Sequence, residues 1–424
     1  MTQAVQMREI GGHELPYSEN TAILGREVRL PGSDIVLKNA IVSQPLEGCD
    51  STVDGAPGEL TRYRYRRFLD SGVGLIWLES LAAQEEGRSN QHALWITDDN
   101  VDAYKASIDE LKSDCPEVPI VAQLTHSGRF SAPTGKKEPI IATYNPHHNA
   151  RVPLPEDYPV VTDEYLDRTI EAFAHAAHLC EQAGFDGVDV KACHGYLFSE
   201  LLSAYNRPGR FGGSFENRAR MLLETVEAVK AETNNLLAAT RICHADTIPY
   251  PYGFGMKQDG SLEYDQTELL QLVSALHDRA VNLVNVSVGR VTVNREFSDL
   301  DSDSIPKDTN ADLFNRFFQG TKALAHTFPD MCFVGSGYTL LREDAANVAA
   351  GALEAGDISL VGFGRMALAY PGFAKDVIAG ELDSKKLCTI CGNCYKLLRA
   401  FAPTGCPTRD RETYLPHLQE VLGK

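Results

Sequence analysis

The sequence predicts an α/β fold, namely a single (β/α)8 TIM barrel with a short C-terminal cysteine-containing extension. Three observations favour this fold. Short apolar or β-branched runs alternate with longer amphipathic stretches eight times along the chain. Long polar loops follow several of the runs, as expected where a barrel carries its chemistry. The 424 residues also suffice for one barrel of about 250 residues or more with an appendage.

The predicted strands follow one another at intervals that leave room for a helix after each. They are Ala40–Ser43, Leu75–Ser80, Ile120–Leu124, Gly187–Lys191, Leu237–Cys243, Leu283–Ser287, Met331–Ser336 and Ile358–Gly362. The helices are predicted near residues 58–70, 100–113, 162–184, 215–232, 264–279, 311–327, 341–351 and 371–379. Eight units in a row favour a closed barrel, because an open sheet of eight parallel strands has two edges to protect.

The third predicted helix illustrates the pattern. Thr162 is a good N-cap residue, and apolar residues then recur at Leu166, Ile170 and Phe173 with the spacing of a buried helical stripe. Gly184 follows the stripe and is expected to end the helix.

Composition and charge exclude several classes of protein. The formal net charge of -18 argues against a surface for nucleic acids or anionic membranes, which is normally basic. The first twenty residues lack the basic start and apolar run of a secretion signal, and no run of about 18 apolar residues is present. We therefore expect a cytoplasmic protein with no nucleic-acid or membrane partner.

The cysteines fall into two groups. Six are scattered through apolar contexts and are expected to be reduced thiols. The other four crowd a short stretch near the end of the chain, where the barrel pattern stops. The predicted organisation is therefore a barrel over residues 1–385 and a cysteine-rich segment with a tail over residues 386–424.

Two long loops are candidates for the functional region. Residues 125–160 follow the third strand, contain several prolines and show no periodicity. Residues 289–310 follow the sixth strand and are similar in character. Both are expected to be functional loops rather than linkers.

Glycine pairs at the ends of the last two strands predict a phosphate site. The seventh strand ends in Gly335-Ser336-Gly337, and the eighth ends in Gly362-Phe363-Gly364-Arg365. Glycines allow backbone N–H groups to approach an anion, and loops after strands 7 and 8 of barrels recurrently bind phosphate. The alternative is that both pairs form ordinary tight turns.

The run from Lys191 to Leu197 leaves the fourth strand and carries His194 and Tyr196. At the C-terminal end of a barrel strand, such side chains can donate a hydrogen bond to a carbonyl oxygen and supply a proton. The alternative is that they only pack in a loop.

The stretch from Asp186 to Arg220 closely resembles the signature of the Old Yellow Enzyme family (NADH:flavin oxidoreductase / 2,4-dienoyl-CoA reductase-like FMN-dependent ene-reductases). The similarity extends over about residues 25–380. LKNAIVSQPL resembles the family's first strand, GVGLIWLES its second and VAQLTHSGR its third.

The resemblance implies that FMN lies across the barrel mouth, is reduced by NADH or NADPH, and passes hydride to an activated C=C bond. It places Gln123 at the flavin ring and Arg241 beside the flavin N1–C2=O edge. The residues that it implies for FMN binding are Gln44, Pro45, Leu46, Ser80, Gln123, Arg241, Gly335, Ser336, Gly337, Gly364 and Arg365.

The resemblance also assigns the catalytic residues. His194 and Tyr196 match the pair that polarises and protonates the substrate in the family. Lys191 stands where the family has a histidine, and its ammonium can donate to a carbonyl or to a substrate carboxylate. Lys191 as a structural ion-pair partner is the alternative. Gln44 and Glu47 also depart from the smaller or redox-tuning residues common in the family's first strand.

Cys388, Cys391, Cys394 and Cys406 have the spacing C-x2-C-x2-C-x11-C. Four thiolates so close together indicate a [4Fe–4S] cluster or, second, a tetrahedral zinc site. Cysteines without metal remain the alternative. The spacing also resembles the cluster segment of longer family branches, in which electrons pass to a second nucleotide-binding domain. Only a tail follows here, so a cluster would need an external electron-transfer protein.

Three functions follow from these observations. The first is an ene-reductase that uses NAD(P)H and a small-molecule α,β-unsaturated carbonyl substrate. The second is an amine or demethylating dehydrogenase that passes electrons through the cysteines to a partner protein. The third is a non-catalytic flavin-binding barrel. The natural substrate, the choice between NADH and NADPH, and homo-oligomerisation depend on loop shapes and stay open.

Overall fold

The computed structural model describes residues 5–150, 152–290 and 308–423, and the structural statements below concern these residues. The loop predicted after the sixth strand lies mostly outside them. None of the described helices is both long enough and apolar enough to cross a bilayer.

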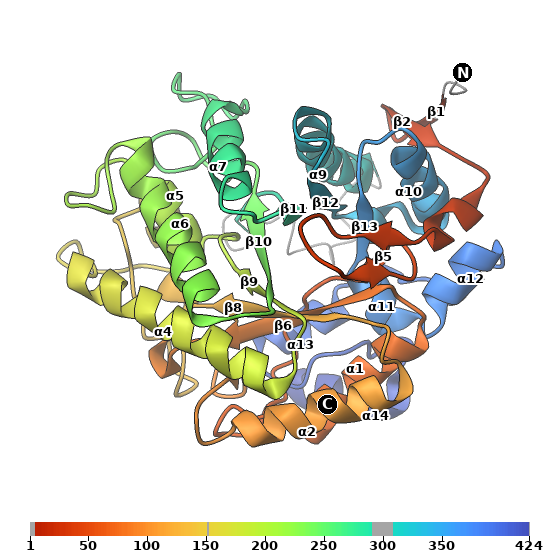
Figure 1. Cartoon of the computed structure of the whole chain (residues 1–424), viewed down its shortest axis with the longest axis horizontal. Coiled ribbons are helices and arrows are strands. Elements are labelled where there is room, and N and C mark those ends of the chain that lie inside the picture. The colour runs from red at the N-terminus through yellow and green to blue at the C-terminus, as the bar shows by residue number, and fades with distance from the viewer. Residues whose placement is uncertain (1–4, 151, 291–307, 424) are drawn as a thin grey trace.

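Eight parallel strands close into a barrel at the centre of the molecule (Figure 1). Their order around the barrel is β5–β13–β12–β11–β10–β9–β8–β6, and β5 also pairs with β6. The strands are β5 (Ile41–Ser43), β6 (Leu75–Ala82), β8 (Ile120–Thr125), β9 (Gly187–Val190), β10 (Leu237–Cys243), β11 (Leu283–Ser287), β12 (Cys332–Gly335) and β13 (Leu360–Phe363). The predicted fold and all eight predicted strands are confirmed, each to within two residues at either end.

Closure depends on the short strand β5. Ile41 pairs with Val361 of β13 on one side, and Val42 pairs with Leu75 of β6 on the other. Every residue of the eight strands is buried, because one face of the sheet fills the barrel interior and the other lies under the helices.

Eight helices cover the outside of the barrel (Figure 1). They are α1 (Glu59–Asp70), α2 (Val101–Asp114), α4 (Asp163–Ala183), α6 (Phe215–Glu232), α7 (Thr267–His277), α9 (Asp308–Thr327), α10 (Ala345–Glu354) and α12 (Phe373–Ala379). Each predicted helix is present. The helix predicted at 341–351 begins later, at Ala345, because residues 338–344 form a separate 3-10 helix.

Helix α4 has the ends that its sequence predicts. The Thr162 hydroxyl accepts a hydrogen bond from the Tyr165 N–H at 3.2 Å. At the other end Gly184 has φ 87°, the left-handed conformation that stops a helix at little cost for glycine.

Shorter helices and strands lie near the ends of the barrel strands and at the N-terminus. The other helices near the barrel are α3 (Pro146–Asn149), α5 (Leu197–Leu202) and α11 (Arg365–Ala369), and β7 (Leu94–Trp95) extends the sheet beside β6. The N-terminal hairpin consists of β1 (Gln6–Ile10) and β2 (His13–Tyr17), and β3 (Val28–Arg29) pairs with β4 (Val36–Leu37). The hairpin lies beside α10 (Figure 1), where the Ser18 N–H donates to the Asn347 carbonyl at 3.0 Å.

Residues 386–423, which we call the C-terminal segment, contain α13 (Asn393–Arg399) and α14 (Arg411–Val421). Polar contacts fasten the segment to the barrel. The Thr404 N–H donates to the Gly48 carbonyl at 2.7 Å. Asp410 accepts a hydrogen bond from the Tyr63 hydroxyl at 3.1 Å and lies 3.5 Å from the Arg67 guanidinium. The segment is therefore held against α1 and the loop after β5.

Candidate active site

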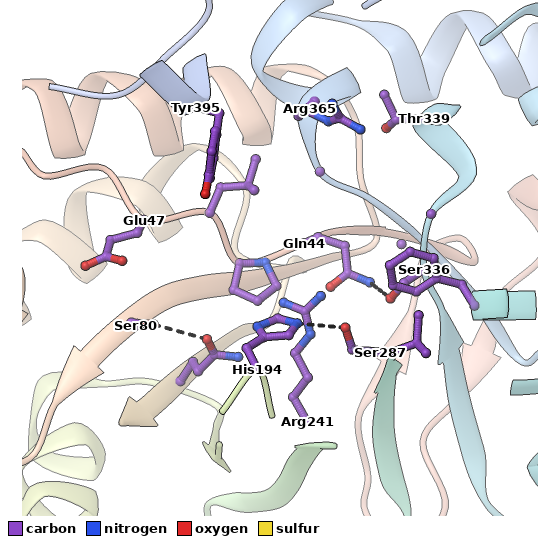
Figure 2. Close-up of a pocket in the computed structure, with 18 of the residues that line it drawn as sticks. Gln44, Glu47, Ser80, His194, Arg241, Ser287, Ser336, Thr339, Arg365 and Tyr395 are labelled. Atoms are coloured by element: carbon purple, nitrogen blue, oxygen red, sulfur yellow. Dashed lines mark hydrogen bonds between the residues drawn. The ribbon is translucent and has the colours of Figure 1, made fainter. Parts of the chain in front are cut away.

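A cavity of about 310 Å³ opens at the C-terminal ends of the barrel strands, where barrel chemistry is expected. It combines residues from almost every strand end with three from the C-terminal segment (Figure 2). Predicted site residues in its lining are Gln44, Pro45, Leu46, Ser80, Gln123, Lys191, His194, Tyr196, Arg241, Ser336, Gly337, Gly364 and Arg365. Gly335 ends β12 next to Ser336 but does not line the cavity.

Gln44 is fixed by hydrogen bonds at the end of β5. Its amide nitrogen donates to the Ser336 hydroxyl at 3.0 Å (Figure 2), and its carbonyl oxygen accepts from the Asn285 amide at 2.8 Å. Gly362 makes room for this arrangement, because a Cβ there would lie 1.9 Å from the Gln44 amide nitrogen. Gly362, which was predicted to belong to a phosphate-binding turn, therefore also allows the Gln44 side chain to pack closely.

Gln123 is oriented by a buried carboxylate that sequence reasoning missed. The Gln123 amide nitrogen donates to Asp189 at 2.7 Å, and the Trp77 indole donates to the same oxygen at 2.8 Å. The other Asp189 oxygen accepts from the backbone N–H of Arg241 at 2.7 Å. Burial raises the pKa of Asp189, and the hydrogen bonds from Gln123 and Trp77 oppose that effect. Asp189 thus positions two of the residues expected to bind FMN.

Arg241 is a buried cation that has no ion-pair partner in the described part of the chain. Only 8% of the residue is exposed, and its Nε is fully buried without a hydrogen bond. Among the described residues no carboxylate lies within 4.0 Å of its guanidinium. A buried guanidinium is costly unless an anion or acceptor satisfies it, so this position suits the electron-rich edge of a ligand.

Lys191 is a second buried cation without a carboxylate partner. Its ammonium donates to the Ser80 hydroxyl at 2.6 Å and lies 3.9 Å from the centre of the Tyr196 ring. In the described part of the chain no carboxylate approaches it within 4.0 Å, so the structural ion pair considered above is absent. Burial lowers the pKa of Lys191. The amine therefore has donor capacity left for a ligand in the cavity.

His194 and Tyr196 emerge together after β9. His194 has φ 64°, and its Nε2 lies 2.7 Å from the Ser287 hydroxyl (Figure 2). Burial, together with the charges of Arg241 and Lys191, lowers the pKa of His194 well below its usual value, so the imidazole is neutral. The Tyr196 hydroxyl makes no hydrogen bond with any described residue, and burial raises its pKa. Tyr196 is thus a neutral phenol with a proton to give.

Glu47 is the carboxylate in the cavity lining. One of its oxygens accepts hydrogen bonds from the Ser89 hydroxyl and from the Asn90 amide, the latter at 3.0 Å. Burial raises the pKa of Glu47 to about 7, although the positive charge of Lys191 opposes this. The sequence marked Glu47 only as a departure from the family, since its surroundings come from a distant loop.

The glycine-rich strand ends lie at one end of the cavity with Thr339 and Arg365 (Figure 2). Gly337 has φ 89°, and a Cβ there would lie 2.9 Å from the Phe317 ring. Arg365 forms no ion pair within 4.0 Å with a described carboxylate. Backbone N–H groups and a free guanidinium are what a phosphate requires.

The charge of the lining is opposite to that of the chain. Lys191, Arg241 and Arg365 face one carboxylate, Glu47, in a protein with a net charge of -18. Three cations gathered in one cavity without carboxylate partners fit a ligand that carries negative charge at more than one point. FMN, with a phosphate and an electron-rich ring edge, satisfies this requirement.

The four cysteines of the C-terminal segment line a second, smaller cavity. Arg365 and Gly392 belong to the linings of both cavities, so the cysteines lie directly behind one end of the main cavity. Within the described ranges, no three His, Cys, Asp or Glu side chains are placed to hold a single metal ion. Binding of a [4Fe–4S] cluster or of zinc by the four cysteines therefore stays a prediction.

The chain matches the model of the NADH:flavin oxidoreductase / NADH oxidase family over residues 32–383. It is 31% identical over 266 residues to an NADPH dehydrogenase of Geobacillus thermodenitrificans (strain NG80-2). The aligned region covers 62% of this chain and 72% of that protein.

Two solved structures share the fold. A 2-naphthoyl-CoA reductase in complex with 2-naphthoyl-CoA superposes with a TM-score of 0.74 at 19% identity, covering 92% of this chain and 57% of that chain. An old yellow enzyme homologue from Zymomonas mobilis superposes with a TM-score of 0.63 at 21% identity, covering 91% of this chain and 97% of that chain. The chain thus spans little more than half of the first structure and nearly all of the second.

Proposed function

Because the chain belongs to the NADH:flavin oxidoreductase / NADH oxidase family, the Old Yellow Enzyme family, we propose that this oxidoreductase reduces an activated C=C bond. The reductant is NADH or NADPH, and the substrate is an α,β-unsaturated carbonyl compound. When bound in this cavity, FMN would supply the hydride-transfer chemistry between the nicotinamide and the substrate. Membership of this family also argues against a non-catalytic barrel.

The residues that would hold FMN line one cavity, and each carries a group that suits a different part of the cofactor. Gln123 would bind the pyrimidine edge, and Arg241 would stabilise negative charge on the reduced ring. Pro45 and Ser80, which also line the cavity, would lie beside the ring, and Gly337, Gly364 and Arg365 would hold the phosphate. The partnerless Arg241 is the observation that best supports this placement, since its burial needs an acceptor.

Lys191, His194 and Tyr196 serve the substrate. Lys191 and His194 would donate hydrogen bonds to the carbonyl oxygen and so withdraw electrons from the C=C bond. Tyr196 would then give its proton to the carbon that does not receive hydride. The convergence of these three side chains in one cavity carries the proposed reaction. It is supported by the Tyr196 hydroxyl, which has no hydrogen-bond partner among the residues that the structure describes.

Tyr196→Phe tests the assignment of the proton donor. We expect alkene reduction to slow about 100-fold or more, within the range typical of general acid catalysis. Flavin reduction by NAD(P)H should stay within about threefold, because that step takes no proton from Tyr196. Stopped-flow absorption measures both half-reactions. Equal slowing of the two would remove Tyr196 from this role.

A second candidate is an amine or demethylating dehydrogenase that passes electrons through a cysteine-bound cluster to a partner protein. Arg365 and Gly392 line both the main cavity and the cavity of the cysteines. This favours the dehydrogenase, because the cysteines lie close to the main cavity. An anaerobic absorption spectrum with iron analysis separates the candidates. About four irons per chain and no activity with NAD(P)H would support the dehydrogenase, whereas flavin bands without iron would support the ene-reductase.

A further inference from the structure

The C-terminal segment supplies part of the wall of the main cavity. Gly392, Tyr395 and Leu398 line it together with the barrel residues. In Figure 2 the ring of Tyr395 points down into the cavity, while His194 and Arg241 approach from the opposite side. These three residues come from outside the eight βα units, and no catalytic or FMN-binding role has been given to them above.

The geometry of α13 explains why these side chains face inward. Tyr395 and Leu398 are three residues apart and therefore lie on the same face of the helix. Leu397 points the other way and packs with Tyr414 and Leu418 in a small hydrophobic cluster with α14. The helix thus has one face on its own segment and one on the cavity.

The wall is fixed rather than loosely appended. Thr404 binds the carbonyl of Gly48, the residue that directly follows Glu47. Asp410, whose side chain is 8% exposed, is held by Tyr63 and Arg67 of α1. The position of Tyr395 is therefore tied to the loop that carries Glu47.

Tyr395 also faces the space in which the substrate would react. Tyr196 and Tyr395 line the same cavity, and burial raises the pKa of the Tyr196 phenol. The Tyr395 side and the Tyr196 side therefore enclose the same volume.

We propose that Tyr395 is a specificity-determining residue whose ring closes the cavity opposite the Lys191–Tyr196 side and limits the size of the group that a substrate carries. This inference rests on the proposed function and adds a substrate class to it. Compact enones fit under the ring, whereas enones with a bulky substituent at that end are excluded. The selectivity therefore originates in the C-terminal segment and not in the barrel.

Binding of saturated ketones, which cannot be reduced at a C=C bond, tests the inference without turnover. The dissociation constants of cyclohexanone and 4-phenylcyclohexanone are measured by titration calorimetry on the FMN-loaded protein. Tyr395→Ala should shift the ratio of the two constants at least about tenfold toward the larger ketone, the equivalent of about 1.4 kcal/mol. Leu398→Ala should shift it in the same direction, and it is a second test if Tyr395→Ala does not fold.

Two controls separate the ring from other effects. Tyr395→Phe keeps the ring and should leave the ratio within about twofold. Tyr144→Ala removes a tyrosine that is 44% exposed and outside the cavity lining, and should leave it unchanged. An unchanged ratio in Tyr395→Ala with full FMN content would overturn the inference while leaving the proposed function intact. Failure of the wild type to bind either ketone would overturn both.

Discussion

Arg64 and Arg241 are both buried arginines with opposite surroundings. Arg64 lies 2.8 Å from Asp50 and 2.7 Å from Glu79, and all three side chains are at most 2% exposed. Arg241 has no such partner among the described residues. Removing one member of a buried ion pair leaves a costly unpaired charge, whereas a buried cation without a carboxylate partner gains one only when a ligand binds. We therefore expect Arg64 to affect the stability of the protein and Arg241 to affect ligand binding.

Replacing each of these arginines by methionine should have opposite results. Arg64→Met leaves two buried carboxylates unpaired and should lower the free energy of unfolding by about 3–5 kcal/mol. Arg241→Met should leave the FMN-free protein at least as stable as the wild type but weaken FMN binding about tenfold or more. Urea denaturation and FMN titration measure the two effects. A strong loss of stability in FMN-free Arg241→Met would mean that Arg241 is structural.

Glu47 provides a pH-dependent prediction. Burial raises its pKa to about 7 in the folded protein, above the ordinary value of 4.5. The folded state therefore binds this proton more tightly than the unfolded state, and the resulting stability is present below about pH 4.5 and lost as pH rises through about 7. Glu47→Gln removes this titration. Its free energy of unfolding should therefore fall by about 1–3 kcal/mol less between pH 5 and 8 than that of the wild type. Equal losses would place the Glu47 pKa near its ordinary value.

At the residue scale, the site was predictable where its chemistry is local. His194 and Tyr196 follow one strand directly, and the glycines of the phosphate end follow two others. Asp189 and Tyr395 were not predicted. Asp189 is a charged residue inside an otherwise apolar strand, which was the available signal. Tyr395 reaches the cavity only because the chain returns to the loop after β5, and no local periodicity encodes that return.

At the element scale, a glycine of β13 lies directly against the side chain of Gln44, the residue that follows β5. Gly362 pairs with Val42 across the two strands, and its missing side chain leaves the space for Gln44. The contact between Gly362 and Gln44 therefore joins the two strands that close the barrel to a side chain that lines the cavity.

Gly362→Ala should therefore displace the Gln44 side chain. We expect a loss of about 1–3 kcal/mol of unfolding free energy, the usual cost of overpacking, together with weaker FMN binding. Adding Gln44→Ala should restore most of the stability, because it removes the atom that the new Cβ meets. A double-mutant cycle by denaturation measures the coupling. Purely additive losses would show that the two residues do not share this space.

The eight helices that cover the barrel were well predicted because their periodicity is strong, whereas α14 was expected only as part of a tail. The strands were equally clear, since each is an apolar run buried on both faces. The N-terminal hairpin was missed although Gly11 and Gly12 join its strands, a pair typical of a two-residue turn. The two residues of β7 are too few to form a pattern, and only pairing with β6 defines them.

At the scale of the whole molecule, FMN should stabilise the folded chain because its site exists only there. Free FMN at about 100 times its dissociation constant contributes about 2.7 kcal/mol. For 424 residues this corresponds to a rise in melting temperature of about 3 °C. Riboflavin, which lacks the phosphate, should give a clearly smaller rise at the same concentration, because Arg365 and the glycine-rich strand ends have nothing to bind. Equal rises in calorimetry would contradict the predicted phosphate end.

The cavity is assembled from residues far apart in the chain, and this affects how the protein is made. Gln44 and Arg365, both expected to bind FMN, line the same space although roughly 320 residues separate them. At about 5–20 residues per second, a ribosome needs roughly 16–64 s to advance from one to the other. The nascent chain therefore cannot complete the FMN site until Arg365 has been synthesised. Acquisition of the cofactor thus reports that all eight strands of the barrel have been synthesised and closed.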